Sequence, residues 1–326
     1  MIDLSIVIPI HNEAPCLAEL HQELTQTLGS CGRSYEIIVV DDGSSDDSFR
    51  ILAALQAVDP RLRVIRFRRN FGQTAAFAAG FDYARGRVIV TSDGDLQNDP
   101  RDIPALVDTL ERGHDIACGW RKDRKDAFLS RRLPSMMANW LISATTGVWL
   151  HDYGCSLKAF RAEVVKPLKL YGEMHRFLPA IASEQGVTIA EQVVNHRARR
   201  HGASKYGISR TMRVVLDLLT VKFLLSYSTR PLQMFGLMGF VLGGAGAALL
   251  AVLGGLRLTQ RLSLSDHAPL VLFAILLTFT GLQLVTLGLL AEMQARTYHE
   301  SQNKPTYVIR EILQTPAAER VGSHNA

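Results

Sequence analysis

The sequence predicts an α/β fold, a mostly parallel sheet with helices on both faces, joined to a C-terminal hairpin of two membrane helices. In the N-terminal half, short apolar runs alternate with stretches of helical periodicity. This order is typical of a mostly parallel sheet. Two long apolar stretches follow near the C-terminus of the 326-residue chain. The chain therefore combines a soluble unit with a membrane unit.

Each element of the N-terminal half follows from its local pattern. Short apolar runs predict strands at residues 4–10, 35–40, 62–67 and 88–91. Helical periodicity predicts helices near residues 14–29, 45–58 and 74–84. Ligands of such sheets bind outside the carboxyl ends of the strands. The polar residues that follow each strand are therefore the candidates for a functional site.

The two apolar stretches, residues 231–257 and 269–291, are expected to span a bilayer. The second has no charged residue and would extend ~34 Å as a helix, against a hydrocarbon core of ~30 Å. The first is uncharged up to Arg257. Gly239 and Gly243 have the spacing of small residues at which membrane helices pack closely.

The regions around these spans complete the expected domain order. Residues 1–207 form the sheet domain, residues 208–230 an interfacial helix, and residues 292–326 a tail. Residues 127–147 and 208–229 mix apolar and basic positions, which is typical of helices in the membrane interface. Packing on the sheet domain is the alternative. Because no signal peptide precedes the first strand, we expect the sheet domain and the tail in the cytoplasm.

The distribution of charge indicates which partners the protein binds, and the cysteine spacing indicates the state of its thiols. Six basic residues lie within 121–132 against two acids, and six more lie within 197–213 with none. Basic clusters before a membrane span favour anionic lipid headgroups. Aromatic residues are not interleaved with them, which argues against nucleic acid as a partner. The four cysteines show no paired metal-ligand spacing, so free thiols are expected.

Two acids, Asp41 and Asp42, follow the second predicted strand. Adjacent carboxylates at this position can hydrogen-bond a nucleobase edge and ribose hydroxyls, while Ser44 or Ser45 caps the next helix. The alternative is that the two acids serve in capping alone. Capping does not require both, so one is available for a ligand.

The segment Asp93-Gly94-Asp95-Leu96-Gln97 follows the fourth predicted strand. Two carboxylates one residue apart can share a hard divalent cation with a polyphosphate, since such cations prefer oxygen ligands. Gly94 is expected to leave room for a ligand near the backbone. A polar turn is the alternative.

An ordered set of polar motifs runs along the chain: Pro9-Ile10-His11-Asn12-Glu13, Asp41-Asp42-Gly43-Ser44, Arg69-Asn70-Phe71-Gly72-Gln73, Asp93-Gly94-Asp95-Leu96-Gln97 and Asp152-Tyr153-Gly154-Cys155. The set resembles family 2 glycosyltransferases of the GT-A fold, from about residue 4 to residue 312. More narrowly, it resembles the polyprenyl-phosphate glycosyltransferases, which include dolichyl-phosphate mannose synthase and the bacterial undecaprenyl-phosphate formamidoarabinose transferases. Gly94 departs from the usual Ala, and Ala291-Glu292-Met293 departs from the usual Gly-Glu-Tyr.

The resemblance implies roles for the matching residues. Donor nucleotide binding is implied for Pro9, Asn12, Glu13, Asp41, Asp42, Asp93, Arg199, Ser204 and Lys205. Asp95 and Gln97 match the metal-binding positions, with Mg²⁺ or Mn²⁺ as cofactor. Arg121 and Arg131 match arginines that hold the acceptor phosphate. Together with Asp95 and these arginines, Asp152 is a candidate catalytic residue that could orient a sugar hydroxyl, act as a base or cap a turn.

The implied reaction is an inverting, metal-dependent transfer of a sugar from a nucleotide-diphosphate sugar, UDP more than GDP, to undecaprenyl phosphate or a related polyprenyl phosphate. The alternatives are a processive polysaccharide synthase of the same fold and a non-catalytic nucleotide-sugar-binding scaffold. The resemblance also implies a multi-pass protein of the bacterial inner membrane and a homo-oligomer such as a tetramer. A chain that ends at Arg230 is expected to fold and to bind nucleotide.

Overall fold

The computed structural model describes residues 2–122, 139–140, 142–144, 146–170, 174–197, 231–258, 267–301 and 306–315. The chain divides into two compact units, Met1–Leu218 with Pro305–Ala326, and Leu219–Lys304. We call the first the sheet unit and the second the helical unit, and each is described by itself.

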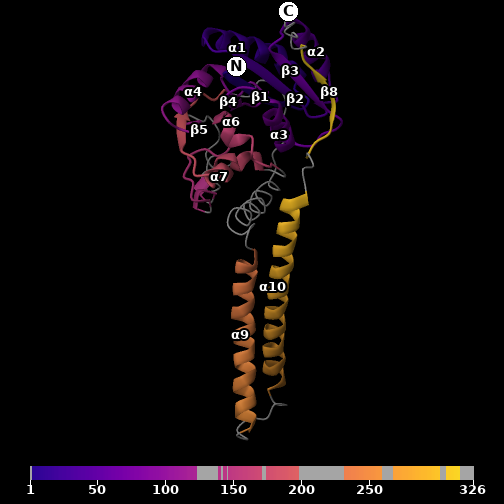
Figure 1. The fold of residues 1–326 in the computed structure, drawn as a ribbon, viewed down its shortest axis with the longest axis vertical. Helices are drawn as coiled ribbons and strands as arrows, with labels where there is room; N and C mark the ends of the chain where they lie inside the picture. The colour runs from indigo at the N-terminus through magenta and orange to yellow at the C-terminus, as the bar shows by residue number, and fades with distance from the viewer. Residues whose placement is uncertain are drawn as a thin grey trace, which may run out of the picture. The chain divides into compact units, whose positions relative to one another are not determined.

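The sheet unit is built on one mixed sheet, whose described strands follow the order β7-β5-β6-β4-β1-β2-β3-β8 (Figure 1). The strands are β1 Leu4–Ile10, β2 Tyr35–Asp41, β3 Leu62–Phe67, β4 Val88–Thr91, β5 Ile116–Trp120, β6 Lys158–Arg161, β7 Ile189–Val193 and β8 Ile309–Leu313. β6 is antiparallel to β4 and β5, and β8 is antiparallel to β3, while the other pairs are parallel. The predicted α/β fold with a mostly parallel sheet is confirmed.

Strand direction brings the candidate loops to one edge of this sheet. β1 to β4 run parallel to one another. β5 runs the same way because it opposes β6, which opposes β4, and β7 is parallel to β5. The carboxyl ends of these six strands and the amino end of β6 therefore share one edge, which we call the site edge.

The described helices of the sheet unit are η1 Ala14–Cys16, α1 Leu17–Ser30, α2 Ser48–Val58, α3 Gln73–Tyr83, η2 Pro100–Asp102, α4 Ile103–Glu111, α6 Ala162–Val165, η4 Met174–Phe177 and α7 Leu178–Ser183. η1 with α1, then α2 and α3, match the three predicted helices, and the later ones were not predicted. α1 shows why such a segment is helical. Its leucines 17, 20, 24 and 28, three or four residues apart, are all buried in the core beside β1 and β2.

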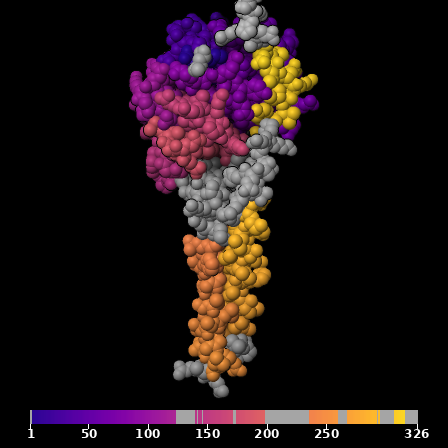
Figure 2. All heavy atoms as spheres, viewed as in Figure 1, coloured from indigo at the N-terminus to yellow at the C-terminus, as the bar shows by residue number. Residues whose placement is uncertain are grey.

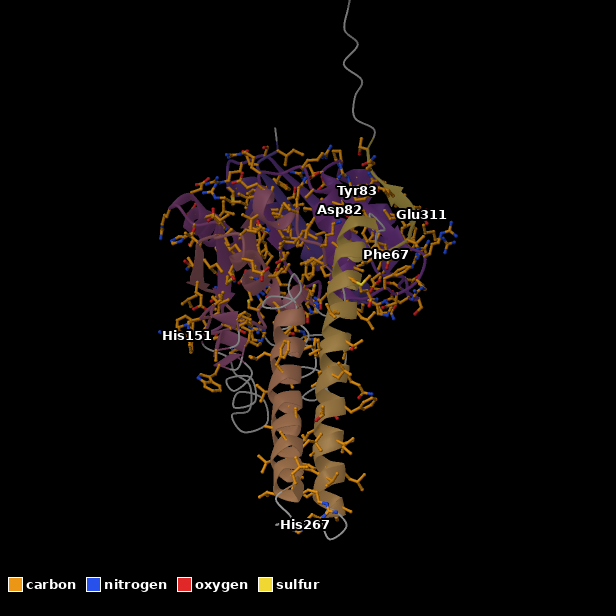
Figure 3. All side chains as sticks on the ribbon, turned by 60° about the horizontal axis from the view of Figure 1, so that its bottom comes forward. Phe67, Asp82, Tyr83, His151, His267 and Glu311 are labelled. Carbon is orange, nitrogen blue, oxygen red and sulfur yellow. The ribbon has the colours of Figure 1, made fainter. Side chains whose placement is uncertain are left out.

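The strands β5 to β8 have no counterpart in the prediction, and the last of them is β8. It follows the long helix of the helical unit and pairs with β3, with Arg66 opposite Glu311. Tyr307 stacks on Phe67 with ring centroids 5.1 Å apart and donates its hydroxyl to Asp82 at 2.7 Å. In Figure 2 the yellow atoms of this segment lie against purple atoms of the N-terminal half, and Figure 3 labels Phe67, Asp82 and Glu311 around it. Residues 306–315 are thus part of the sheet unit.

The helical unit consists of α9, Pro231–Leu258, and α10, Ala268–Ser301, among its described residues. A Cβ on Gly239 would lie 2.6 Å from the carbonyl oxygen of Gly281, and a Cβ on Gly281 would lie 2.4 Å from the nitrogen of Gly243. The predicted close packing through small residues is confirmed. Both helices are long and apolar enough to cross a membrane, and only 22% and 11% of their apolar windows are buried. A core helix of a soluble protein would be mostly buried.

The two segments that were predicted to be interfacial helices fall partly or wholly outside the described residues. Of residues 127–147, the structure describes 139–140, 142–144 and 146–147, and all of these except Gly147 are helical. Residues 208–229 lie outside the described residues.

The four cysteines are free, as expected, and burial raises the pKa of Cys118 to about 12, so that its thiol stays protonated.

Candidate active site

The loop after β1 is tied to the loop after β2. Pro9 lies in β1, and Asn12, which follows that strand, has a φ of 58°. The side-chain oxygen of Asn12 accepts from the backbone nitrogen of Ser45 at 2.8 Å. The backbone nitrogen of Glu13 donates to the hydroxyl of Ser48 at 3.1 Å. Three predicted donor-site residues therefore lie together at the site edge, with Asn12 engaged in shaping it.

The serines at this edge join loops and do not cap a helix. Asp47 is the N-cap residue of α2, and no side chain makes a capping hydrogen bond there. The Ser44 hydroxyl instead accepts from the backbone nitrogen of Asn12 at 3.0 Å. The prediction that Ser44 or Ser45 caps this helix is wrong, because the loop after β1 takes up their hydrogen bonds.

Asp42 holds the loop that follows β3. Its two carboxylate oxygens accept from the backbone nitrogens of Phe71 at 2.6 Å and Gly72 at 2.9 Å. Burial raises the pKa of Asp42 and outweighs the opposite effect of these hydrogen bonds. Gly43 has a φ of 66°, and a Cβ there would lie 2.5 Å from the backbone of Arg69. Only a glycine fits this close approach without strain.

Asp41, at the end of β2, has a free hydrogen-bonding position. One oxygen accepts from the backbone nitrogen of Ser44 at 2.9 Å. The other, Oδ2, is buried and receives no hydrogen bond from the part of the chain that the structure describes. The side chain of Arg66 places a cation beside this atom, with its Nε 3.6 Å away. A buried oxygen without a donor is costly, so this atom suits a ligand that brings an N–H or O–H.

Asp93 lies between two side-chain donors. Gln73 of α3 donates to Oδ1 at 2.7 Å, and Ser156 donates to Oδ2 at 2.6 Å. The Ser156 hydroxyl also accepts from the side chain of Asn98 at 2.8 Å. Ser156 was not predicted as a site residue, although it directly follows the motif that starts at Asp152.

The turn after Asp93 has an unusual backbone. Leu96 has a φ of 62°, in the region that favours glycine, and its side chain is buried in the core. The backbone nitrogen of Gln97 donates to Asp95 Oδ1 at 3.1 Å. A residue held in this strained conformation is a common feature of functional sites. The buried leucine thus fixes the turn that carries both predicted metal ligands.

Gly94 does not leave space for a ligand. A Cβ at this position would lie 2.1 Å from Cδ1 of Ile10. The expectation of an open approach to the backbone is wrong, because the side chain of Ile10 fills that space.

Asp95 and Gln97 offer one carboxylate and one amide oxygen. The described residues contain no group of three or more His, Cys, Asp or Glu side chains that could hold a metal. The pair nevertheless fits Mg²⁺ or Mn²⁺, since such ions bind through one or two carboxylates and complete their shell with water and substrate phosphate.

Arg121 and Asp152 form a buried ion pair. Arg121 donates from Nε to Oδ2 at 2.6 Å and from Nη2 to Oδ1 at 2.9 Å. The two side chains are 12% and 5% exposed. Burial opposes the charge on Arg121, but the hydrogen bonds and the charge of Asp152 outweigh it and raise the pKa of Arg121.

The loop that carries Asp152 and Ser156 is also held by Lys158. This buried lysine donates its ammonium protons to the carbonyl oxygens of Tyr153, at 3.3 Å, and Cys155. One short loop therefore supplies the partner of Arg121 and one partner of Asp93.

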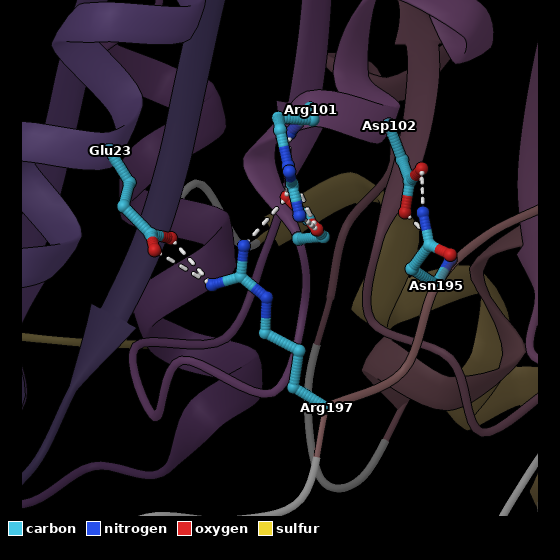
Figure 4. A network of polar contacts seen from close by, with 6 residues as sticks. Glu23, Arg101, Asp102, Asn195 and Arg197 are labelled. Atoms are coloured by element: carbon cyan, nitrogen blue, oxygen red, sulfur yellow. Dashed lines mark hydrogen bonds and ion pairs between the residues drawn. The ribbon is translucent and has the colours of Figure 1, made fainter.

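A second ion network lies beside the Asp95–Gln97 turn (Figure 4). The backbone nitrogen of Arg197 donates to the carbonyl oxygen of Gln97 at 3.0 Å. Its guanidinium bridges Glu23, at 2.7 Å, and Asp99, at 2.9 Å. Burial would raise the pKa of Asp99, but hydrogen bonds from Arg101 and Arg197 lower it to about 2.

Four predicted site residues, Arg131, Arg199, Ser204 and Lys205, lie outside the described residues. Three of them belong to the motif that begins at Arg199, two residues after the described residue Arg197. The other predicted site residues all lie along the site edge.

Sequence similarity to known proteins identifies the family of this chain. The model of the family described as glycosyl transferase family 2 matches residues 5–168. Dodecaprenyl-phosphate galacturonate synthase from Rhizobium johnstonii is 46% identical over 320 residues, which cover 96% of this chain and 93% of that protein. The chain belongs to glycosyl transferase family 2. This glycosyltransferase is also 38% identical, over 95% of its length and 94% of the relative, to undecaprenyl-phosphate 4-deoxy-4-formamido-L-arabinose transferase from Edwardsiella ictaluri.

Solved structures share the fold. Glucosyl-3-phosphoglycerate synthase from Mycobacterium tuberculosis, in complex with Mn²⁺, UDP and phosphoglyceric acid, superposes with a TM-score of 0.54 at 19% identity. The match covers 68% of this glycosyltransferase and 78% of that chain. At this identity the likeness shows the GT-A-like architecture, and it agrees with the mixed sheet described above.

Proposed function

We propose that this glycosyltransferase transfers a sugar from a UDP-sugar to the phosphate of a membrane polyprenyl phosphate. The observation that carries the proposal is the arrangement of the site edge, where a buried carboxylate oxygen of Asp41, without a donor among the described residues, and the largely buried Arg121 occupy separate positions. The first suits a nucleobase and the second an anionic acceptor. The names of the two curated relatives, both polyprenyl-phosphate enzymes, support the same substrates.

The donor nucleotide is assigned to the ends of β1, β2 and β4. Asp41 Oδ2 accepts a hydrogen bond from the base, and Asp42 fixes the loop after β3 beside it. Asp93, held by Gln73 and Ser156, faces the ribose and diphosphate side. Pro9, Asn12 and Glu13 shape the wall of this pocket, while Arg199, Ser204 and Lys205 approach the diphosphate. UDP in a structural neighbour supports uridine as the nucleoside.

Asp95 and Gln97 would hold a divalent ion. An ion bound there supplies Lewis-acid stabilisation of the charge that develops on the departing diphosphate. The Mn²⁺ of the solved neighbour supports this assignment. Leu96 and Arg197 keep the turn that carries both ligands in place.

The acceptor phosphate is assigned to Arg121, with Arg131 as the second arginine. A phosphate monoester has a second pKa near ~6, so it is largely dianionic at neutral pH and needs little activation by a base. The planar guanidinium can bind two phosphate oxygens at once. Asp152, which already binds Arg121 through both oxygens, orients this arginine. Direct attack by the phosphate oxygen inverts the configuration of the anomeric carbon.

The proposal places the enzyme in a bacterial inner membrane. Residues 231–257 and 269–291 span the bilayer, and residues 208–230 lie in its interface. The chain leaves the sheet unit before α9 and rejoins it in β8 after α10. Two crossings return the chain to the face from which it started, so residues 1–207 and the tail of residues 292–326 share the cytoplasmic side. A homo-oligomer, with a tetramer as one form, is part of the same proposal.

Transfer of labelled sugar to a lipid fraction tests the function. The full-length protein in bilayers is incubated with undecaprenyl phosphate and one UDP-sugar at a time. The mass of the lipid product is measured by mass spectrometry. We expect one sugar per lipid, no product after chelation with EDTA, and recovery with added Mg²⁺ or Mn²⁺. A long polymer, or no transfer from any nucleotide sugar, would contradict the proposal.

A further inference from the structure

One charged side chain of the sheet unit contacts both the donor pocket and the strand that follows the membrane helices. Arg66 lies in β3, and its Nε lies 3.6 Å from Asp41 Oδ2. On its other side, Nη1 donates to Glu311 of β8 at 3.0 Å. Arg66 therefore stands between a proposed nucleobase ligand and the tail of the chain.

The position of the Arg66 guanidinium is defined from three directions. It lies 4.0 Å above the ring centroid of Phe49 in α2, a cation–π contact. Register fixes Glu311 directly across from Arg66 in the β3–β8 ladder. The side chain of Arg66 is 22% exposed, while that of Asp41 is fully buried. The arginine thus has a restricted set of orientations, and one of them points to Asp41.

Asp41 needs this neighbour to act as a ligand. A buried carboxylate without a nearby cation is costly. A carboxylate oxygen accepts hydrogen bonds, as a ring N–H of uracil requires. The positive charge 3.6 Å from Oδ2 offsets the cost of keeping this acceptor buried beside the base.

We infer that Arg66 is a positioning residue for the donor nucleotide, and that Glu311 of β8 sets its orientation. This inference rests on the proposed role of Asp41 in donor binding. The strand after the membrane hairpin then contributes to the donor pocket as well as to stability. No predicted site residue of the sequence analysis lies in β3 or β8.

A double-mutant cycle tests the inference on the full-length protein, with binding of UDP measured by calorimetry in the presence of Mn²⁺. Glu311→Gln removes the charge that orients Arg66, and we expect UDP affinity to fall about two- to fivefold, the range of a cross-strand charge pair. Arg66→Met should weaken UDP by at least about tenfold, because it leaves the buried carboxylate without its cation. Arg66→Lys, which keeps the charge, should recover part of the loss.

Arg310→Gln is the matched control. Arg310 is exposed on the same strand, beside Glu311 in sequence, and its replacement should leave UDP affinity unchanged. Thermal unfolding of every variant checks that β8 still pairs with β3.

The Asp41→Asn background separates the possible results. The inference requires that Glu311→Gln has little further effect in this background, because the glutamate acts through Arg66 on Asp41. If Glu311→Gln weakens UDP binding equally in the wild type and in the Asp41→Asn background, Glu311 has a purely structural role and the inference is overturned. If Asp41→Asn weakens UDP binding but the Glu311 and Arg66 variants bind normally, the inference fails while the proposed function stands. If Asp41→Asn leaves UDP binding unchanged, the proposed role of Asp41 in donor binding is wrong, and the inference about Arg66 fails with it.

Discussion

Two parts of the site edge bind their carboxylates with different kinds of donor, backbone nitrogens for Asp42 and the side chain of Arg121 for Asp152. Asp42 is held by two backbone nitrogens, which belong to a loop and carry no net charge. Asp152 is held by a guanidinium on a side chain, which carries a positive charge. The difference teaches what each place can do. Backbone donors make a fixed wall for a neutral base, whereas an arginine that pairs with a carboxylate keeps further N–H groups for a phosphate.

The largest effect should follow from loss of the cation in this pair. Arg121→Ala removes the proposed ligand of the acceptor phosphate, and we expect transfer to fall by about 10²–10³-fold, the usual cost of one preorganised charge-stabilising donor. Transfer rates at saturating UDP-sugar measure this. Full activity in this variant would place the acceptor elsewhere.

Asp152→Asn tests whether the carboxylate acts as a base or as a support for Arg121. We expect a loss of about tenfold, smaller than for Arg121→Ala, because the arginine stays but is less well oriented. The pH–rate profile should keep its shape. Loss of its acidic limb would instead show that Asp152 takes a proton in the reaction.

Acid should weaken the Arg197 network and reveal the charge of Asp99. The pKa of this residue is lowered to about 2 from an ordinary value near 3.8, so its contribution to stability is complete above that value and is lost as the pH falls toward 2. Asp99→Asn should cost about 1.5–3 kcal/mol near neutral pH, as for hydrogen bonds to charged groups. Unfolding temperatures from pH 7 to pH 3 should show the difference from the wild type shrinking below pH 4. A difference that does not change with pH would argue against the charge.

The smallest effect concerns the strand that closes the sheet. Tyr307→Phe removes one hydrogen bond to Asp82 and should cost about 1 kcal/mol, or about 2–4 °C in Tm. Thermal unfolding of the full-length variant measures this. A change of Tm near zero would mean that stacking on Phe67 alone holds the segment.

β8 also changes an expectation drawn from the sequence. A chain that ends at Arg230 lacks β8 and leaves the backbone of β3 unpaired at the edge of the sheet. Such edges lower stability and promote aggregation. We therefore expect this truncated chain to be less stable than the full-length protein and to bind UDP more weakly.

Local patterns predicted much of the fold and of the site. β1 to β4 and their helices were found because each has its own periodicity, and the acids at their carboxyl ends were found because a parallel sheet gathers those ends. The strands β5 to β8 and the partners Ser156, Arg66 and Glu311 were missed. Their roles depend on pairing between segments far apart in the chain, as between Arg66 and Glu311, and no local pattern reports such contacts.

The packing of single residues was equally hidden. Gly94 suggested open space, and Ser44 and Ser45 suggested a cap, because both interpretations use only neighbouring residues. The structure fills the first space with Ile10 and gives the serines to Asn12. Distant side chains decided both cases.

Steady-state kinetics with donor and acceptor varied in turn test the central claim, that two separate places at one edge bind two substrates. The account predicts that Asp42→Asn raises the KM for the UDP-sugar and leaves that for undecaprenyl phosphate unchanged. Arg121→Lys should raise the KM for undecaprenyl phosphate and leave that for the UDP-sugar unchanged. If both substitutions raise the KM of the same substrate, the division of the site edge into a donor place and an acceptor place is wrong.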